Sequence, residues 1–181
     1  MSRSNWFLAA TAIVLLASAG CATAPKSAEG KIDIEQDAAQ ALARAQAADA
    51  TFTPVLRDAY GYAVFPSVGK GGIGIGGAYG RGVLYRNGAA IGYCKITQGT
   101  IGLQLGAQAY TEMIVFQTRD AFDSFKSGNF AFDAQATVVA LKSGAGANAK
   151  YANGVAVFTM DEAGLMYEAT VGGQKFDFQA R

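Results

Sequence analysis

Residues 61–88 read GYAVFPSVGKGGIGIGGAYGRGVLYRNG, and this stretch decides the fold because its glycines alternate with apolar residues instead of following a helical period. Asn87-Gly88 between apolar runs is a strong signal for a two-residue β-hairpin turn. Pro66 predicts the end of a strand, because it lacks the N–H that a ladder needs. We therefore predict strands over residues 63–65, 71–85 and 90–97.

The glycines within this stretch have two physical interpretations. Gly72, Gly74 and Gly77 match the spacing of a dinucleotide-binding loop, but no helix follows them, so we reject that motif. Within a strand, alternation places Gly72, Gly74 and Gly76 on one face and Ile73 with Ile75 on the other. A face without Cβ atoms either allows close packing and sheet curvature or lets a ligand approach the backbone.

The flanking sequence predicts helices on both sides of this sheet. Apolar residues recur at helical spacing over 33–50, and Pro54 predicts a helix over 54–59 with Thr53 as its N-cap. Another helix is predicted over 119–126, with Ala121, Phe122 and Phe125 facing inward. Further strands are predicted over 99–108, 112–117, 130–142, 154–159, 164–170 and 174–178. The expected fold is α+β, with N-terminal helices packed on a strongly curved, mainly antiparallel sheet or partial barrel.

The composition argues against several classes of function. Lys and Arg number 15 against 14 Asp and Glu, and this near-neutral balance argues against general nucleic-acid binding. The chain has no His, the commonest general base and metal ligand, and it has 2 Cys. Cys94 lies in a predicted strand, where we expect a buried, small apolar side chain. Asp58 with Glu112, or Asp161 with Glu162, would be the candidates for an acidic catalytic pair, but nothing in their spacing supports one. We expect a non-catalytic protein without metal or cofactor.

The N-terminus predicts an export signal. Arg3 precedes residues 6–19, which carry no charge and are too few to cross a bilayer core, which needs about 20 residues. This run ends in small residues directly before Cys21. The order is typical of a signal peptide over residues 1–20.

The residues around Cys21 resemble the lipobox of bacterial lipoproteins, in which the cysteine thiol is acylated and the leader is cut before it. Ser18 stands where that motif more often has Leu. Ala22 follows the cysteine where inner-membrane retention usually calls for Asp, which implies an anchor in the outer membrane, facing the periplasm. The alternative is an ordinary secretory signal cut near Ala19, with Cys21 incidental. Residues 21–30 are expected to form a flexible tether.

Three blocks in fixed order, residues 61–72, 76–82 and 102–108, resemble the SYLF domain family, and the similarity spans about residues 33–178. Eukaryotic members of that family bind phosphoinositides, some fungal members bind actin, and bacterial members are commonly predicted lipoproteins. The resemblance implies that residues 31–181 form a SYLF-like lipid-binding domain.

Basic side chains near the glycines are the candidate headgroup ligands. Lys70 and Arg81 bracket the glycine-rich strand, and Arg86 and Lys95 lie around the hairpin. A guanidinium holds a phosphate with two hydrogen bonds, so an anionic phospholipid is the expected partner. We expect Lys70 and Arg81 to share a face with the glycines. In the alternative, each is a solvated surface charge, and the domain binds another envelope protein or a cell-wall component.

Acylation at Cys21 predicts a measurable mass. The mature chain from its native host is expected to begin at Cys21 and to carry two or three acyl chains, because two chains anchor a protein stably where one does not. Intact-mass spectrometry checks this, and globomycin should block the processing. Cys21→Ser is expected to leave the membrane fraction when the membranes are washed with high salt, which an acylated chain would resist, and a mature chain without acyl mass would overturn the assignment.

Overall fold

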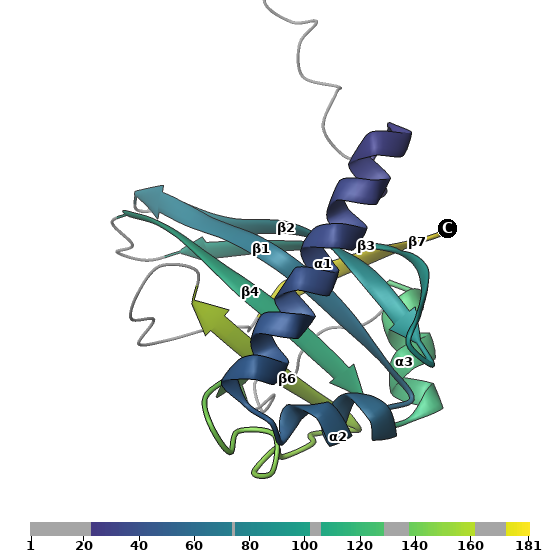
Figure 1. The fold of residues 1–181 in the computed structure, drawn as a ribbon. Helices are drawn as coiled ribbons and strands as arrows, with labels where there is room; N and C mark the ends of the chain where they lie inside the picture. Colours follow the sequence, from purple (N-terminus) through teal and green to yellow (C-terminus); the bar gives the residue numbers. More distant parts are fainter. Residues whose placement is uncertain (1–22, 74, 102–105, 129–137, 162–172) are drawn as a thin grey trace, which may run out of the picture.

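A computed structural model of the chain describes residues 23–73, 75–101, 106–128, 138–161 and 173–181. One seven-stranded sheet, ordered β5-β6-β4-β1-β2-β3-β7, forms the centre of the fold (Figure 1). All neighbouring strands are antiparallel except β5 and β6. The elements are α1 (Ala28–Ala48), α2 (Phe52–Asp58), β1 (Gly61–Ile73), β2 (Ile75–Arg86), β3 (Ala89–Ile101), β4 (Gly106–Phe116), α3 (Arg119–Lys126), β5 (Val138–Ala140), β6 (Val155–Asp161) and β7 (Gln174–Ala180). This confirms the α+β class, and the sheet is not closed.

The turn between β2 and β3 is the predicted hairpin. Asn87 and Gly88 have φ angles of 51° and 76°, and Arg86 pairs with Ala89 across the turn. Positive φ at both central positions gives the twist that suits flanking strands, and it explains why Asn-Gly occurs here.

The glycine-rich stretch departs from the prediction of one strand over residues 71–85. The chain reverses within it, so that Ile73 of β1 pairs with Ile75 of β2. The alternation of Gly and Ile continues through the reversal, and the sequence pattern therefore hides it. The predicted end at Pro66 is also wrong, because β1 passes through a bulge between Val64 and Ser67, where a missing N–H is tolerated.

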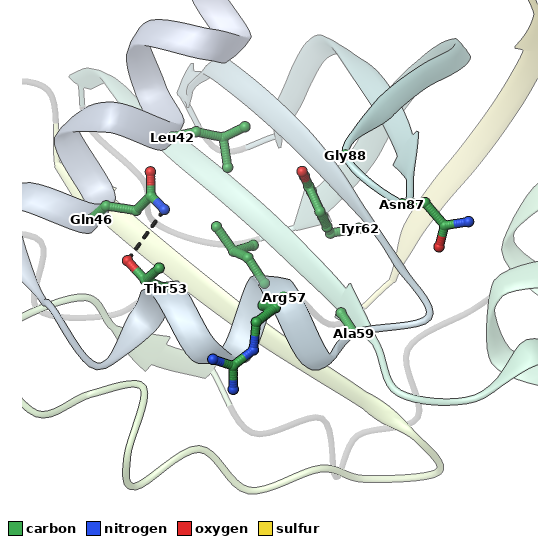
Figure 2. A pocket seen from close by; sticks show the side chains of 9 residues that line it. Leu42, Gln46, Thr53, Arg57, Ala59, Tyr62, Asn87 and Gly88 are labelled. Carbon is green, nitrogen blue, oxygen red and sulfur yellow. Dashed lines mark hydrogen bonds between the residues drawn. The ribbon is translucent and has the colours of Figure 1, made fainter.

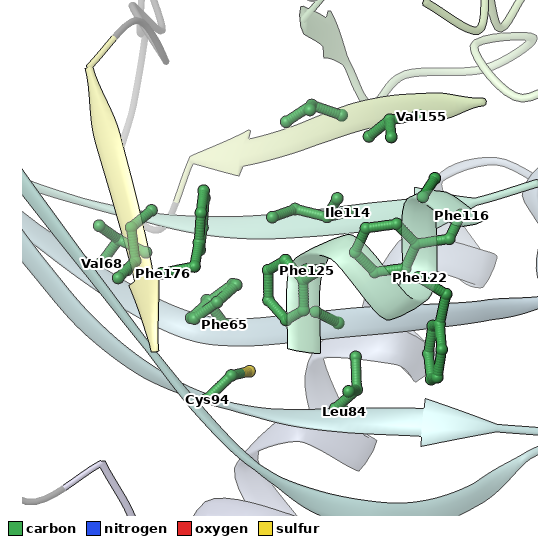
Figure 3. Close-up of a cluster of buried hydrophobic side chains, with 14 of the residues drawn as sticks. Phe65, Val68, Leu84, Cys94, Ile114, Phe116, Phe122, Phe125, Val155 and Phe176 are labelled. Carbon is green, nitrogen blue, oxygen red and sulfur yellow. The ribbon is translucent and has the colours of Figure 1, made fainter. Parts of the chain in front are cut away.

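The sheet has a hydrophobic core on each face. On one face, α3 begins and ends as predicted, and Ala121, Phe122 and Phe125 are buried against the strands (Figure 3). Cys94 lies in the same core and is fully buried, as expected. On the other face, α1 packs through its alanines against β1 and β2. We call these the α3 side and the α1 side of the sheet.

Both N-terminal helices begin earlier than predicted. Helix α1 begins at Ala28, because the Ser27 side chain accepts a hydrogen bond from Gly30 N at 3.0 Å and caps its first turn. Residues 28–30 therefore belong to the helix and not to the tether. Helix α2 begins at Phe52, so Thr53 is not its N-cap. Residues 1–22, which include Cys21, and the strand predicted over 164–170 lie outside the described residues, as does most of that over 130–142.

Asp49 joins the end of α1 to a distant loop. Its buried carboxylate accepts hydrogen bonds from Thr51 N and Thr51 Oγ1, and from Gly144 N and Gly146 N at 3.0 and 2.6 Å. Burial opposes the charge, but these donors outweigh it and lower the pKa of Asp49 to about 2. The loop and the junction between α1 and α2 are thereby held together.

Glu112 is the most perturbed acid of the α3 side. Its side chain is fully buried, and Gln174 Nε2 donates to its Oε2 at 3.0 Å. Glu112 Oε1 has no hydrogen-bond partner among the described residues. Burial raises the pKa of Glu112 to about 7, and the hydrogen bonds from Gln174 and Tyr110 offset this only in part.

Glu112 therefore predicts a loss of stability with rising pH. The pKa of Glu112 is about 7 in the folded chain and near 4.5 in the unfolded chain. The contribution of Glu112 to stability is therefore largest below about pH 4.5, where Glu112 is protonated in both states, and this contribution is lost as the pH rises through about 7. The loss amounts to about 3 kcal/mol. Urea unfolding at about pH 5 and about pH 8 measures it, and because the chain has no His, the side chain that ordinarily titrates in this window does not contribute.

Glu112→Gln, which keeps an acceptor for Gln174 without the charge, is expected to make stability flat over this range. Glu29→Gln on the exposed first turn of α1 is the matched control and should keep the wild-type slope. An unchanged slope in Glu112→Gln would mean that Glu112 does not titrate in this range.

Candidate functional site

Helix α1 leaves part of its own side of the sheet uncovered. Strands β1, β2 and β4 extend past the helix (Figure 1), and here the register aligns residues into rows across the strands. Residues that pair directly across antiparallel strands have their side chains on the same face. Arg81 lies two positions from Val83, which is part of the α1-side core, so Arg81 and the residues paired with it lie on the α1 side. We call this surface the glycine shelf. It consists of Ser67, Gly69, Gly71, Gly77, Tyr79, Arg81, Lys95, Thr97, Gly99, Ala109, Lys175 and Asp177.

The floor of the shelf is bare backbone. A Cβ added to Gly99 would meet nothing within 4 Å, and at Gly69 its nearest neighbour would be Tyr79 O at 3.9 Å. Neither glycine has a positive φ. By contrast, a Cβ at Gly82 would collide with the Val64 carbonyl, and one at Gly92 with the Phe178 ring. Close packing therefore explains Gly82 and Gly92 but not Gly69 and Gly99.

Two cations stand side by side on the shelf. Arg81 pairs directly with Lys95 across β2 and β3, an arrangement that costs stability because like charges face each other. Lys95 Nζ lies 2.9 Å from Asp177 Oδ2, and its side chain is only 11% exposed. Arg81 Nε donates to Tyr79 Oη at 2.9 Å. No ion pair joins Arg81 to a carboxylate of the described residues, so the row keeps a net positive charge.

The border of the shelf adds another cation. Arg44, exposed on α1, has Nη2 3.5 Å from Thr111 Oγ1, and Thr111 in turn donates to the Pro66 carbonyl of the bulge. Tyr79 is 42% exposed at the centre of the shelf, with the Arg81 guanidinium 6.0 Å from its ring centroid. The shelf thus combines an amphipathic ring, bare backbone and positive charge.

The four predicted headgroup ligands do not form one site. Lys70 pairs with Ala78, which is buried in the α3-side core, whereas Arg81 lies on the α1 side; the expected shared face is wrong. The two positions lie on opposite faces because side chains alternate along each strand. Arg86 stacks over Tyr60, 4.7 Å from the ring centroid, at the far end of β2. The structure brings together only Arg81 and Lys95.

The sequence prediction missed Tyr79, Asp177 and Arg44. Tyr79 had a signal, because it lies two residues before Arg81 and so falls on the same face of a strand. Asp177 and Arg44 come from distant parts of the chain, and their places depend on strand pairing and on the path of α1.

The acidic pair considered from the sequence does not form. Asp58 lies at the surface, where its carboxylate accepts from Arg57 Nε and Nη2 at 2.7 and 3.0 Å. Glu112 lies inside the α3-side core beside Gln174. The two carboxylates therefore have separate surroundings and no shared proton.

A pocket of about 510 Å³ lies between α1, α2 and the β2–β3 turn (Figure 2). Leu42, Leu56 and Tyr62 give it an apolar wall, and Gln46 Nε2 donates to Thr53 Oγ1 at 3.2 Å. Arg57, the cation of the pocket, is already paired with Asp58. The pocket is therefore less suited to an anion than the glycine shelf.

Within the described residues, no helix has the length and apolar character needed to span a bilayer. A family profile described as "Ysc84: Las17-binding protein actin regulator" matches residues 97–180. Beta cell expansion factor A from Aeromonas veronii is 31% identical over 154 residues, which cover 84% of this chain and 59% of the relative. The relative is thus considerably longer than the matched region. Both similarities are to the family that the motif blocks resemble, and the chain belongs to the SYLF (Ysc84) family.

Proposed function

We propose that this protein is a non-catalytic lipoprotein of the bacterial envelope, anchored through acylated Cys21, whose glycine shelf binds the headgroup of anionic phospholipid. The observation that carries the proposal is the pair Arg81 and Lys95, which are direct neighbours across two strands and lie beside glycine backbone that no described side chain covers. The fold bears the repulsion between two like charges here, and a bound anion would relieve it.

The chemistry of the shelf suits a phosphodiester. Guanidinium and ammonium groups both bind phosphate, and the planar guanidinium offers two parallel N–H donors. Because Gly69 and Gly99 carry no side chains, a headgroup can approach the sheet closely enough to reach both cations. An exposed tyrosine such as Tyr79 is favoured where one end of a side chain is apolar and the other wet, as at a membrane surface.

The segment matched by the family profile contains part of the shelf, including Lys175 and Asp177, whereas Arg81 precedes it. The profile's description names binding to Las17 and regulation of actin. For this chain, the export signal and the cationic shelf favour lipid over a cytoskeletal protein. If the shelf does not bind lipid, the alternative function is binding of another envelope protein.

Removal of the Arg81 guanidinium is expected to weaken binding to anionic vesicles. For the unacylated chain (Cys21→Ser), Arg81→Gln should lose about tenfold in affinity for phosphatidylglycerol vesicles, the loss of one charge-assisted contact. Flotation at low salt measures this, with phosphatidylcholine vesicles as the uncharged reference.

Arg57→Gln removes an exposed cation away from the shelf and is the matched control. It should bind as the unsubstituted chain does. Equal losses in both variants would point to diffuse attraction by net charge, and no binding by any of them would sink the lipid proposal.

A substitution that adds a side chain to the floor of the shelf should weaken lipid binding without lowering the stability of the fold. In Gly99→Val the added Cβ meets no described atom within 4 Å and the strand gains a β-branched residue, so the stability is expected to be unchanged or higher. The same side chain would stand between the headgroup and the backbone and should lower vesicle binding severalfold. Thermal unfolding and flotation measure the two effects, and full binding by a stable Gly99→Val would contradict the shelf as the site.

A further inference from the structure

The chain is ordered close to the proposed anchor. Ala24 is 4% exposed within the α1-side core, and its N–H donates to Gln179 Oε1 of β7 at 3.3 Å. Pro25 is also buried, and Ser27 caps the helix that follows. The chain is therefore attached to the α1 side of the sheet soon after Cys21.

This attachment limits how far the domain can move from the membrane. Cys21 precedes Ala24 by three residues, and a fully extended chain of that length spans at most about 11 Å. A body of about 150 residues has a radius of gyration of roughly 15 Å. So short a connection does not pass around the domain to its opposite face.

The point of attachment lies on the same face as the shelf. Gln179 pairs with Tyr93, which is buried in the α1-side core, and Asp177 of the shelf lies two residues before Gln179 on β7. Alternation along β7 places Gln179 and Asp177 on one face. The acyl anchor and the two shelf cations therefore belong to the same side of the molecule.

The exposed apolar side chains lie on this side as well. Among the residues whose burial is described, the exposed large hydrophobic side chains are Ile32, at 55%, and Tyr79, at 42%. Ile32 lies on α1 near the attachment point, and Tyr79 lies at the centre of the shelf. Arg44 and Lys175 add exposed positive charge around them. Apolar and cationic side chains on one surface are the combination that binds an anionic lipid interface.

From this arrangement we infer that the α1 side of the sheet lies against the membrane that holds the protein's own anchor, so that the shelf binds phospholipid of that bilayer and does not bridge to a second membrane. The inference rests on the proposed function, because it requires both the acylated Cys21 and a lipid-binding shelf. It assigns the partner as the surface of the host bilayer.

Tryptophan fluorescence tests this orientation. Trp6 lies in the leader, so a processed chain contains no tryptophan, and Tyr79→Trp places a single reporter on the shelf. The acylated protein is reconstituted into vesicles that contain phosphatidylglycerol with brominated acyl chains, which quench tryptophan on contact. Tyr60→Trp, on the α3 side beside Phe122, is the matched control.

Tyr79→Trp is expected to lose emission when the brominated lipid is in the host vesicles, and to keep it when only added second vesicles carry the bromine. Tyr60→Trp should keep its emission in both cases. Quenching of Tyr79→Trp by the added vesicles alone, or stronger quenching of Tyr60→Trp in the host vesicles, would overturn the orientation and leave lipid binding by the shelf intact.

The same preparations separate this inference from the proposed function. Intact mass reports whether Cys21 is acylated, and flotation of the Cys21→Ser chain reports whether the shelf binds lipid without the anchor. An unacylated mature chain, or a Cys21→Ser chain that does not float, would overturn the proposed function and this inference with it.

Discussion

The register between β2 and β3 is the constraint on which the candidate site depends. The turn at Asn87 and Gly88 fixes that register, because both residues adopt positive φ angles that few other pairs of residues tolerate. A shift by one position would exchange the two faces of β2. Arg81 would then enter the α3-side core, and the cations of the shelf would be separated. Packing of α1 and α3 on opposite faces enforces the same register, since each face of β2 has its own hydrophobic partners.

Glycine has two physical roles in this sheet. At Gly61, Gly82 and Gly92 the missing side chain lets an aromatic ring or a carbonyl approach, and the core could not close otherwise. At Gly69 and Gly99 the same absence serves no close contact with any of the described residues. Glycine lowers the stability of a strand. Where a glycine does not avoid a steric clash within the fold, the best explanation for it is a ligand that approaches the backbone from outside. The uncovered shelf follows from this division.

The two faces of the sheet also differ in their treatment of charge. On the α3 side, Glu112 is enclosed beside Gln174 and Tyr110, and burial favours its protonated form. On the α1 side, Lys95 is paired with Asp177, while neighbouring Arg81 is half-buried and forms no ion pair with a carboxylate of the described residues. The α3 side thus disfavours the charge of its buried acid, whereas the shelf on the α1 side keeps a net positive charge. Ala24, which follows the proposed anchor residue by three positions, packs on the same face as the shelf, and this relates the electrostatics of the shelf to the proposed membrane contact.

The sequence by itself determined the features that depend on local chemistry. Helical periodicity and the phenylalanines of α3 identified that helix, Asn87-Gly88 identified the hairpin, and the burial of Cys94 followed from its place in an apolar strand. The motif blocks identified the family. Of the four basic residues that the sequence suggested as headgroup ligands, the structure places Arg81 beside Lys95, whereas Lys70 lies on the opposite face from Arg81; their role as ligands stays a prediction.

Only the tertiary structure decided where the glycine-rich stretch reverses, how the bulge absorbs Pro66, and which glycines stay uncovered. It also decided that Asp177 and Arg44 reach the shelf. These outcomes depend on strand register and on helices that come from distant parts of the chain. A dihedral preference or a period of two is a property of neighbouring residues, whereas the direction of a side chain in a sheet is set by pairing across strands.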